Sequence, residues 1–274
     1  MTWASSAEAV AIGAAAGGLL ALLGIRVAPA RLTRVNHAGR SVPAVLGVAF
    51  VGGLLVGALA TRALEGGGFR PVEAVTIAAV ALVAAAGLLD DLLGGGAERG
   101  FRGHLGGLLR GRPTTGVLKL VVGIGSGVWV ALVIGGGPAR VTAAAVLVAA
   151  SANLWNALDV RPGRSAKWGI VVLVPVLAAA GETGIGLVAG AALGAALGVL
   201  PFDLSEKGML GDAGSNPLGL VAGAGLAAIL PTPWVVVAAS TAVLLQVAAE
   251  TVTISRVVDA LPPLRWFDHL GRRT

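Results

Sequence analysis

Long apolar runs, separated by short polar or Pro/Gly-rich stretches, dominate the pattern of this chain. A membrane-spanning helix needs about 20 mostly apolar residues. Runs close to that length lie near residues 4–25, 42–61, 72–89, 115–136, 141–157, 168–181, 184–201, 216–231 and 234–255. The pattern predicts one all-α, polytopic membrane domain over residues 1–274, with about nine transmembrane helices. Because 168–181 and 216–231 are short, we expect these two helices to be tilted, broken or partly re-entrant.

The composition agrees with a membrane protein and excludes several other classes. Of the 274 residues, 56% are hydrophobic and 12% are charged, with a mean hydropathy of +0.88. A water-soluble fold of this size could not bury that much apolar surface. The chain has no cysteine, so disulfides, thiolate metal sites and a cysteine nucleophile are excluded. The net charge is +6, but the basic residues are scattered over several loops, so we expect no nucleic-acid partner.

The distribution of basic residues predicts the orientation. The first apolar run precedes the first basic residue, Arg26, which is unlike a secretory signal peptide and favours a retained helix with its N-terminus outside. With nine spans, all but three of the 20 Lys and Arg residues fall in loops on the inner side. The exceptions are Arg62, Arg70 and Arg140. The positive-inside rule therefore predicts a multi-pass protein of the cell membrane with a cytoplasmic C-terminus.

Acids and amides gather at the predicted inner ends of the spans. The third span ends in a carboxylate pair, the fifth in two amides and an acid, and an acid precedes the eighth. These residues are Asp90, Asp91, Asn153, Asn156, Asp159 and Asp212. A carboxylate at the hydrocarbon edge is costly unless it is paired, solvated or bound to a cation, so the pattern predicts one shared polar site. Oxygen ligands favour Mg²⁺ over zinc, although Asp90–Asp91 alone also fits an ordinary solvated helix end.

Three motifs together resemble one known family. Gly87-Leu-Leu-Asp90-Asp91-Leu-Leu-Gly94 resembles the Asp-Asp motif of the polyprenyl-phosphate N-acetylhexosamine-1-phosphate transferases, the family of phospho-N-acetylmuramoyl-pentapeptide transferase and its GlcNAc-1-phosphate relatives. Asn153-Leu-Trp-Asn156-Ala-Leu-Asp159 is similar to its Asn-x-x-Asn-Leu-x-Asp motif, and Met209-Leu-Gly-Asp212-Ala-Gly-Ser215 to its Met-Gly-Asp-x-Gly-Ser loop. The segment 36–43 is more weakly similar to the family's early Gly/Pro loop. The three main motifs follow the family's order.

The resemblance implies a Mg²⁺-dependent enzyme of cell-envelope biogenesis, such as peptidoglycan synthesis. It would transfer a sugar-1-phosphate from a UDP-sugar to a polyprenyl phosphate and release UMP at the cytoplasmic face. By the same resemblance, Asp90, Asp91 and Asp212 would be catalytic, with Asp212 and Asp91 at the metal. The implied substrate-binding residues are Asn153, Asn156, Asp159 and Lys119. Arg102, Arg110 and Arg112 could add positive charge near the phosphates, or be solvated loop residues.

Two departures keep other functions open. Pro162 stands where the family usually has a second acid, and His269 is alone where the family has a histidine cluster. One alternative is therefore an inactive relative that binds a polyprenyl lipid or scaffolds cell-envelope enzymes. A second is a transporter, for which Glu250 is the one acid expected in the middle of a span. The oligomeric state is open, and a homodimer is one alternative.

Overall fold

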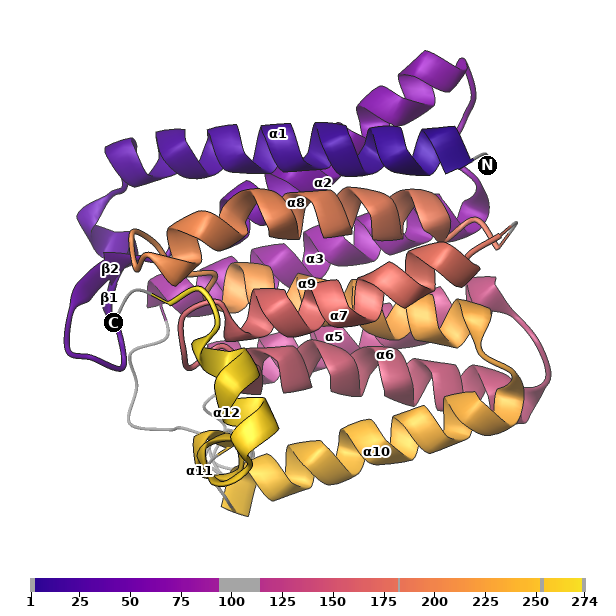
Figure 1. The fold of residues 1–274 in the computed structure, drawn as a ribbon. Coiled ribbons are helices and arrows are strands. Elements are labelled where there is room, and N and C mark those ends of the chain that lie inside the picture. Colours follow the sequence, from indigo (N-terminus) through magenta and orange to yellow (C-terminus); the bar gives the residue numbers. More distant parts are fainter. Residues whose placement is uncertain (1–2, 94–113, 182, 252–253, 273–274) are drawn as a thin grey trace.

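Helices that run back and forth between two ends of the molecule make up most of the structure (Figure 1). The computed structural model describes residues 3–93, 114–181, 183–251 and 254–272. The helices in these residues are α1 (Trp3–Val27), α2 (Leu46–Glu65), α3 (Pro71–Leu93), α5 (Thr115–Ile134), α6 (Pro138–Leu158), α7 (Arg164–Ala179), α8 (Gly186–Leu204), α9 (Asp212–Ile229), α10 (Thr232–Thr251), α11 (Ile254–Ala260) and α12 (Pro262–His269). Between α1 and α2 lie a 3-10 turn, η1 (Ala30–Leu32), and two strands, β1 (Thr33–Val35) and β2 (Ser41–Pro43).

Seven of the described helices are long and apolar enough to cross a membrane: α1, α2, α3, α5, α6, α8 and α10. The chain is therefore a helical bundle of the multi-pass membrane type. The two runs that were predicted to be short correspond to α7, with 16 residues, and α9, with 18. At 1.5 Å per residue these helices are about 24 and 27 Å long, less than the ~30 Å hydrocarbon core. A total of nine spans stays a prediction.

Two of the predicted span boundaries are wrong. The predicted span near 42–61 starts too early, because α2 begins only at Leu46. Ser41–Pro43 instead form β2, which pairs with β1 in an antiparallel register. The predicted span near 234–255 ends too late, because α10 ends at Thr251. The next helix, α11, begins at Ile254. Glu250 lies in the last turn of α10, and its predicted place in the middle of a span stays a prediction.

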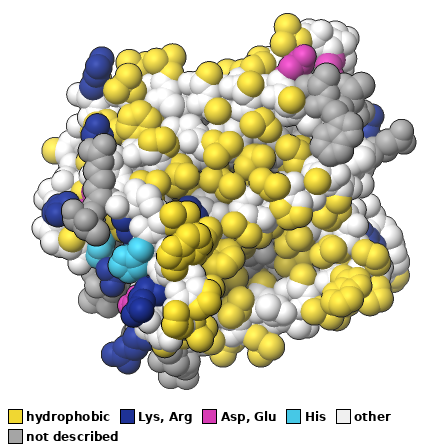
Figure 2. Space-filling view, viewed as in Figure 1, with side chains coloured by type: hydrophobic (Ala, Val, Ile, Leu, Met, Phe, Trp, Pro, Cys, Tyr) yellow, Lys and Arg dark blue, Asp and Glu magenta, His cyan; other side chains and the backbone are white. Residues whose placement is uncertain are grey.

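Basic residues mark one end of the bundle, which we call the basic end. It carries β1, β2, α11 and α12, and the last turns of α3 and α6 and the first turns of α5 and α9 lie there too (Figure 1). Figure 2 shows Lys, Arg and His side chains gathered at this end, while hydrophobic side chains cover the middle of the molecule. Its described basic residues are Arg26, Arg31, Arg34, Arg40, Lys119, Arg161, Arg164, Lys167, Lys207, Arg256, Arg265 and Arg272.

At the opposite end, Arg62 and Arg140 bind groups that belong to the bundle itself. Arg62 Nε donates to the buried carboxylate of Glu73 at 3.1 Å, and Arg62 also forms an ion pair with Glu65. Arg140 donates to the Ala227 carbonyl at 2.7 Å and to the Leu230 carbonyl at 2.8 Å. A cation that binds the last carbonyls of a helix offsets its negative end, so Arg140 caps the C-terminus of α9.

Close contacts through glycine fix the position of α9 within the bundle. A Cβ at Gly87 in α3 would lie 2.3 Å from the carbonyl oxygen of Asp212, the first residue of α9. A Cβ at Gly219 in α9 would lie 2.3 Å from the Ser151 carbonyl oxygen in α6. Glycine at both positions therefore lets three backbones approach one another, as small residues do in membrane bundles. This packing holds the beginning of α9 against the ends of α3 and α6.

Candidate functional site

The N-terminus of α9 is the point where several of the predicted site residues converge. The Asp212 and Ala213 N–H groups donate to the two carboxylate oxygens of Asp91, at 3.2 and 3.0 Å. The carboxylate of Asp159, which follows the last residue of α6, lies close enough to the Gly211 N–H for this group to lower its pKa. Two successive amides at the helix start are thus bound by a carboxylate of α3, and a second carboxylate lies close to the preceding amide. Negative charge at this place is stabilised by the helix dipole.

The loop before α9 requires glycine and is held by the hairpin. Gly211 has a φ of 61°, and a Cβ there would lie 2.8 Å from Asp91 Oδ2. The Met209 N–H donates to the Pro43 carbonyl at 3.0 Å, and the Leu46 N–H donates to the Met209 carbonyl at 3.1 Å. The weakly similar segment 36–43 and the loop 209–215 therefore lie side by side, although they are far apart in the sequence.

Lys119, near the start of α5, connects two of the predicted carboxylates. Its Nζ forms an ion pair with Asp212 and lies 3.4 Å from Asp90 Oδ2. Asp90 also accepts a hydrogen bond from the Thr115 hydroxyl. The three ionised side chains are 18–22% exposed, so each keeps access to the space outside the bundle. The structure thus brings the predicted lysine and the predicted acids together.

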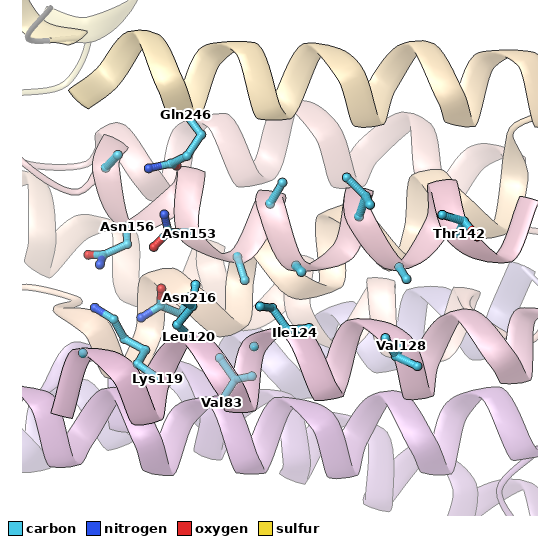
Figure 3. A pocket seen from close by; sticks show the side chains of 18 of the residues that line it. Val83, Lys119, Leu120, Ile124, Val128, Thr142, Asn153, Asn156, Asn216 and Gln246 are labelled. Carbon is cyan, nitrogen blue, oxygen red and sulfur yellow. The ribbon is translucent and has the colours of Figure 1, made fainter. Parts of the chain in front are cut away.

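A groove of about 870 Å³ begins at this cluster and follows α5 and α6 (Figure 3). Polar side chains stand at one end of it, namely Lys119, Asn153, Asn156, Asn216 and Gln246. The rest of its length towards Thr142 is lined mainly by apolar residues such as Ile124 and Val128. Ile124 is 50% and Val128 43% exposed, so the groove is open along the apolar surface of the bundle.

Asn216 is a site residue that the sequence analysis missed. Its side chain is 2% exposed, and Nδ2 donates to the Asp212 carbonyl at 2.8 Å. It also lines the groove beside Lys119. The signal was present in the sequence, because an amide four residues after Asp212 lies on the same face of a helix.

A second cavity of about 310 Å³ lies beside the same helix ends. Residues of the hairpin, of the loop between α6 and α7, and of the end of α8 line it, including His37, Asp159, Pro162, Asp203 and Glu206. Asp203 is 4% exposed and accepts a hydrogen bond from the Gly163 N–H at 3.0 Å. The sequence analysis also missed this acid, although a carboxylate in the last turn of an apolar run carried the same signal as Asp90.

The charge balance around Asp159 is negative. Burial, followed by the charges of Asp203, Asp212 and Asp91, raises the pKa of Asp159 well above its ordinary value, although the Gly211 N–H acts in the opposite direction. A cation bound beside these carboxylates would favour the ionised form. A bound cation would therefore reduce the repulsion among these carboxylates.

The described carboxylates could supply only part of a Mg²⁺ coordination shell. Among the described residues, no group of three or more His, Cys, Asp or Glu side chains is arranged to hold a metal ion. Mg²⁺ is commonly bound through one or two carboxylates, with water and phosphate oxygens completing the shell. Asp212 and Asp159 supply such oxygens. Asp91 uses both oxygens for the α9 amides, but each oxygen keeps a second lone pair.

The remaining predicted residues are placed as follows. His269 is exposed on α12, as expected for a solvated histidine. The Pro162 carbonyl accepts a hydrogen bond from Arg272 Nε at 3.0 Å. Arg102, Arg110 and Arg112 lie outside the described residues.

The fold and the groove define the class as a multi-pass helical membrane protein with a polar, carboxylate-rich site at one end of its bundle. In comparisons with protein-family models and with curated proteins, no match to this chain is found. The geometry of its own residues therefore has to support any assignment of function.

Proposed function

We propose that this protein transfers a sugar-1-phosphate from a UDP-sugar to a polyprenyl phosphate at the cytoplasmic face of the cell membrane, releasing UMP. The observation that carries the proposal is the groove, which is apolar over most of its length and ends at Lys119 and the carboxylates. A polyprenyl phosphate has the same division into a long apolar chain and one anionic group. The proposal also rests on the resemblance of the three motifs.

In this reaction an oxygen of the lipid phosphate attacks the phosphorus atom that carries the sugar. The bond from that phosphorus to the oxygen bridging it to the nucleotide breaks, and UMP leaves with that oxygen. Lys119, at the polar end of the groove, would attract the lipid phosphate, and Asn153 and Asn156 would donate hydrogen bonds to phosphate oxygens. Asp90, adjacent to Lys119, would orient the ammonium group or accept a proton.

Mg²⁺, when bound, offsets the charge that develops on the phosphate oxygens. Asp212 would hold it, with Asp159 as a second carboxylate from α6. Asp91 stays a candidate ligand, but its observed contacts fix the start of α9. We assign the nucleotide sugar to the second cavity, which contains Asp159 in its wall.

The test is UMP release by the purified protein in detergent, with polyprenyl phosphate and a panel of UDP-sugars, with and without Mg²⁺. We expect release that requires both lipid and Mg²⁺ and that is lost in Asp212→Asn. Asp259→Asn is the matched control, because this exposed carboxylate of α11 lies outside the site and should leave turnover unchanged. Full turnover by Asp212→Asn would refute the assignment of the metal site.

A second candidate is an inactive relative that binds polyprenyl lipid without chemistry. It is favoured by Pro162, by the exposed lone histidine and by the pairing of Lys119 with both Asp90 and Asp212. Binding of polyprenyl lipid without release of UMP from any UDP-sugar would support this second candidate. A transporter is less well supported, because Asp90 and Asp212, which the structure brings together, lie at helix ends and not in the middle of a span.

A further inference from the structure

The C-terminal helices are attached to the site end of the bundle by buried charges. Arg164, at the start of α7, is 1% exposed, and Asp268 in α12 is 3% exposed. The Arg164 guanidinium donates to both carboxylate oxygens of Asp268, at 2.7 and 2.9 Å, and to the Ser255 hydroxyl at 3.0 Å. A paired, two-point contact of this kind is strong and fixes geometry. It places α11 and α12 against the beginning of α7.

Lys167 strengthens the same attachment one turn further along α7. Its Nζ donates to the Phe267, Asp268 and Leu270 carbonyls, at 2.8, 2.6 and 3.2 Å. A cation is favourable at these carbonyls because they form the negative end of α12. The Phe267 ring packs edge-on against Trp168, with 5.1 Å between the ring centroids. The C-terminal segment is thus held by charge, by capping and by an aromatic contact.

The attachment continues into the loop that carries Asp159. Asp268 forms a second ion pair with Arg272 at 2.7 Å, and Arg272 Nε donates to the Pro162 carbonyl at 3.0 Å. On the other side of the loop, the Gly163 N–H donates to Asp203. The backbone 159–163 is therefore held between α8 and the C-terminal segment. The same backbone forms one wall of the second cavity.

We propose that Asp268 and Arg272 are positioning residues, which hold Pro162 and thereby fix Asp159 and the wall of the second cavity. This inference rests on the proposed function for its kinetic consequence, since that cavity is assigned to the nucleotide sugar. Arg272 is hydrogen-bonded to the loop through the Pro162 backbone carbonyl, so this contact does not depend on the side chain at position 162. Loss of Arg272 should loosen the loop and weaken donor binding, while the groove for the lipid is unaffected.

The experiment combines hydrogen exchange with kinetics on the full-length protein in detergent. In Arg272→Ala we expect the Val160, Gly163 and Arg164 amides to exchange at least about tenfold faster, because a bond from a charged donor to the loop is lost. We expect the KM for the UDP-sugar to rise by about the same factor, with the KM for polyprenyl phosphate unchanged. Arg272→Lys keeps a charge and a donor and should restore part of both effects. Arg265→Ala, which removes an exposed arginine of α12, is the matched control.

The outcomes separate the inference from the proposed function. Unchanged exchange of these amides in Arg272→Ala would overturn the inference, whether or not the protein is a transferase. Faster exchange with equal rises in both KM values would also overturn it, since a general loss of structure moves both. If the wild-type protein released no UMP while exchange still rose in Arg272→Ala and not in Arg265→Ala, the proposed function would fail and the positioning of the loop would stand.

Discussion

Asp91 should matter to the stability of the protein as much as to its chemistry. Its two oxygens bind the Asp212 and Ala213 N–H groups, at 3.2 and 3.0 Å, and no other element supplies an acceptor to these two amides among the described residues. Removing an N-cap acceptor costs about 0.5–2 kcal/mol, and a hydrogen bond to a charged group contributes about 1.5–3 kcal/mol. We expect Asp91→Ala to lower the free energy of unfolding by about 2–4 kcal/mol.

Asp91→Asn should lower the free energy of unfolding by about half as much as Asp91→Ala. Its amide oxygen can still accept one hydrogen bond, whereas its NH₂ group faces the second N–H. The assay is reversible unfolding in mixed micelles, followed by circular dichroism, together with hydrogen exchange of residues 212–215. Asp259→Ala is the control for loss of a carboxylate at an exposed position. A change below about 0.5 kcal/mol in Asp91→Ala, with unchanged exchange at the start of α9, would refute the capping role.

Three further predictions concern the packing, the charge and the groove of the site. Gly87→Ala should displace the start of α9 and abolish UMP release, because its Cβ would meet backbone at 2.3 Å, whereas Gly125→Ala, with no atom within 4 Å of the new Cβ, should keep full activity. The pKa of Asp159 is raised in the folded protein. At pH values between the ordinary and the raised pKa, the folded protein therefore binds more protons than the unfolded chain. The free energy of unfolding without Mg²⁺ should thus fall as the pH rises through this range. Thermal unfolding at a series of pH values should show this slope, and Asp159→Asn or added Mg²⁺ should flatten it. Ala149→Trp should fill the groove and raise the KM for polyprenyl phosphate at least about tenfold, while Val174→Trp, on the exposed face of α7, should not.

The positions of the helices could be predicted from the sequence because the apolar runs are long. The run near 72–89 corresponds to α3, and the run near 184–201 corresponds to α8, each within a few residues. The hairpin could not be predicted in the same way. Val42 and Pro43 read as the beginning of an apolar span, and only the backbone pairing with β1 shows that they belong to a strand.

The candidate site was predictable in part, for a related reason. Acids at the ends of apolar runs indicate a shared polar site whatever their partners are, so Asp90, Asp159 and Asp212 were found. The partners themselves depend on pairings over long sequence distances, such as Arg164 with Asp268, that leave no local pattern. For the same reason the role of Asp91 as the cap of another helix follows only from the structure.

The burial of α9 has a consequence for the order in which the protein is made. This helix is short, is buried along most of its length, and its first two amides are bound by Asp91 of α3. During synthesis, α3 is made before α9. The Asp91 carboxylate therefore has no α9 amides to bind until α9 has been translated. The site is therefore completed late, and a chain cut short before α9 should leave Asp91 without its partners.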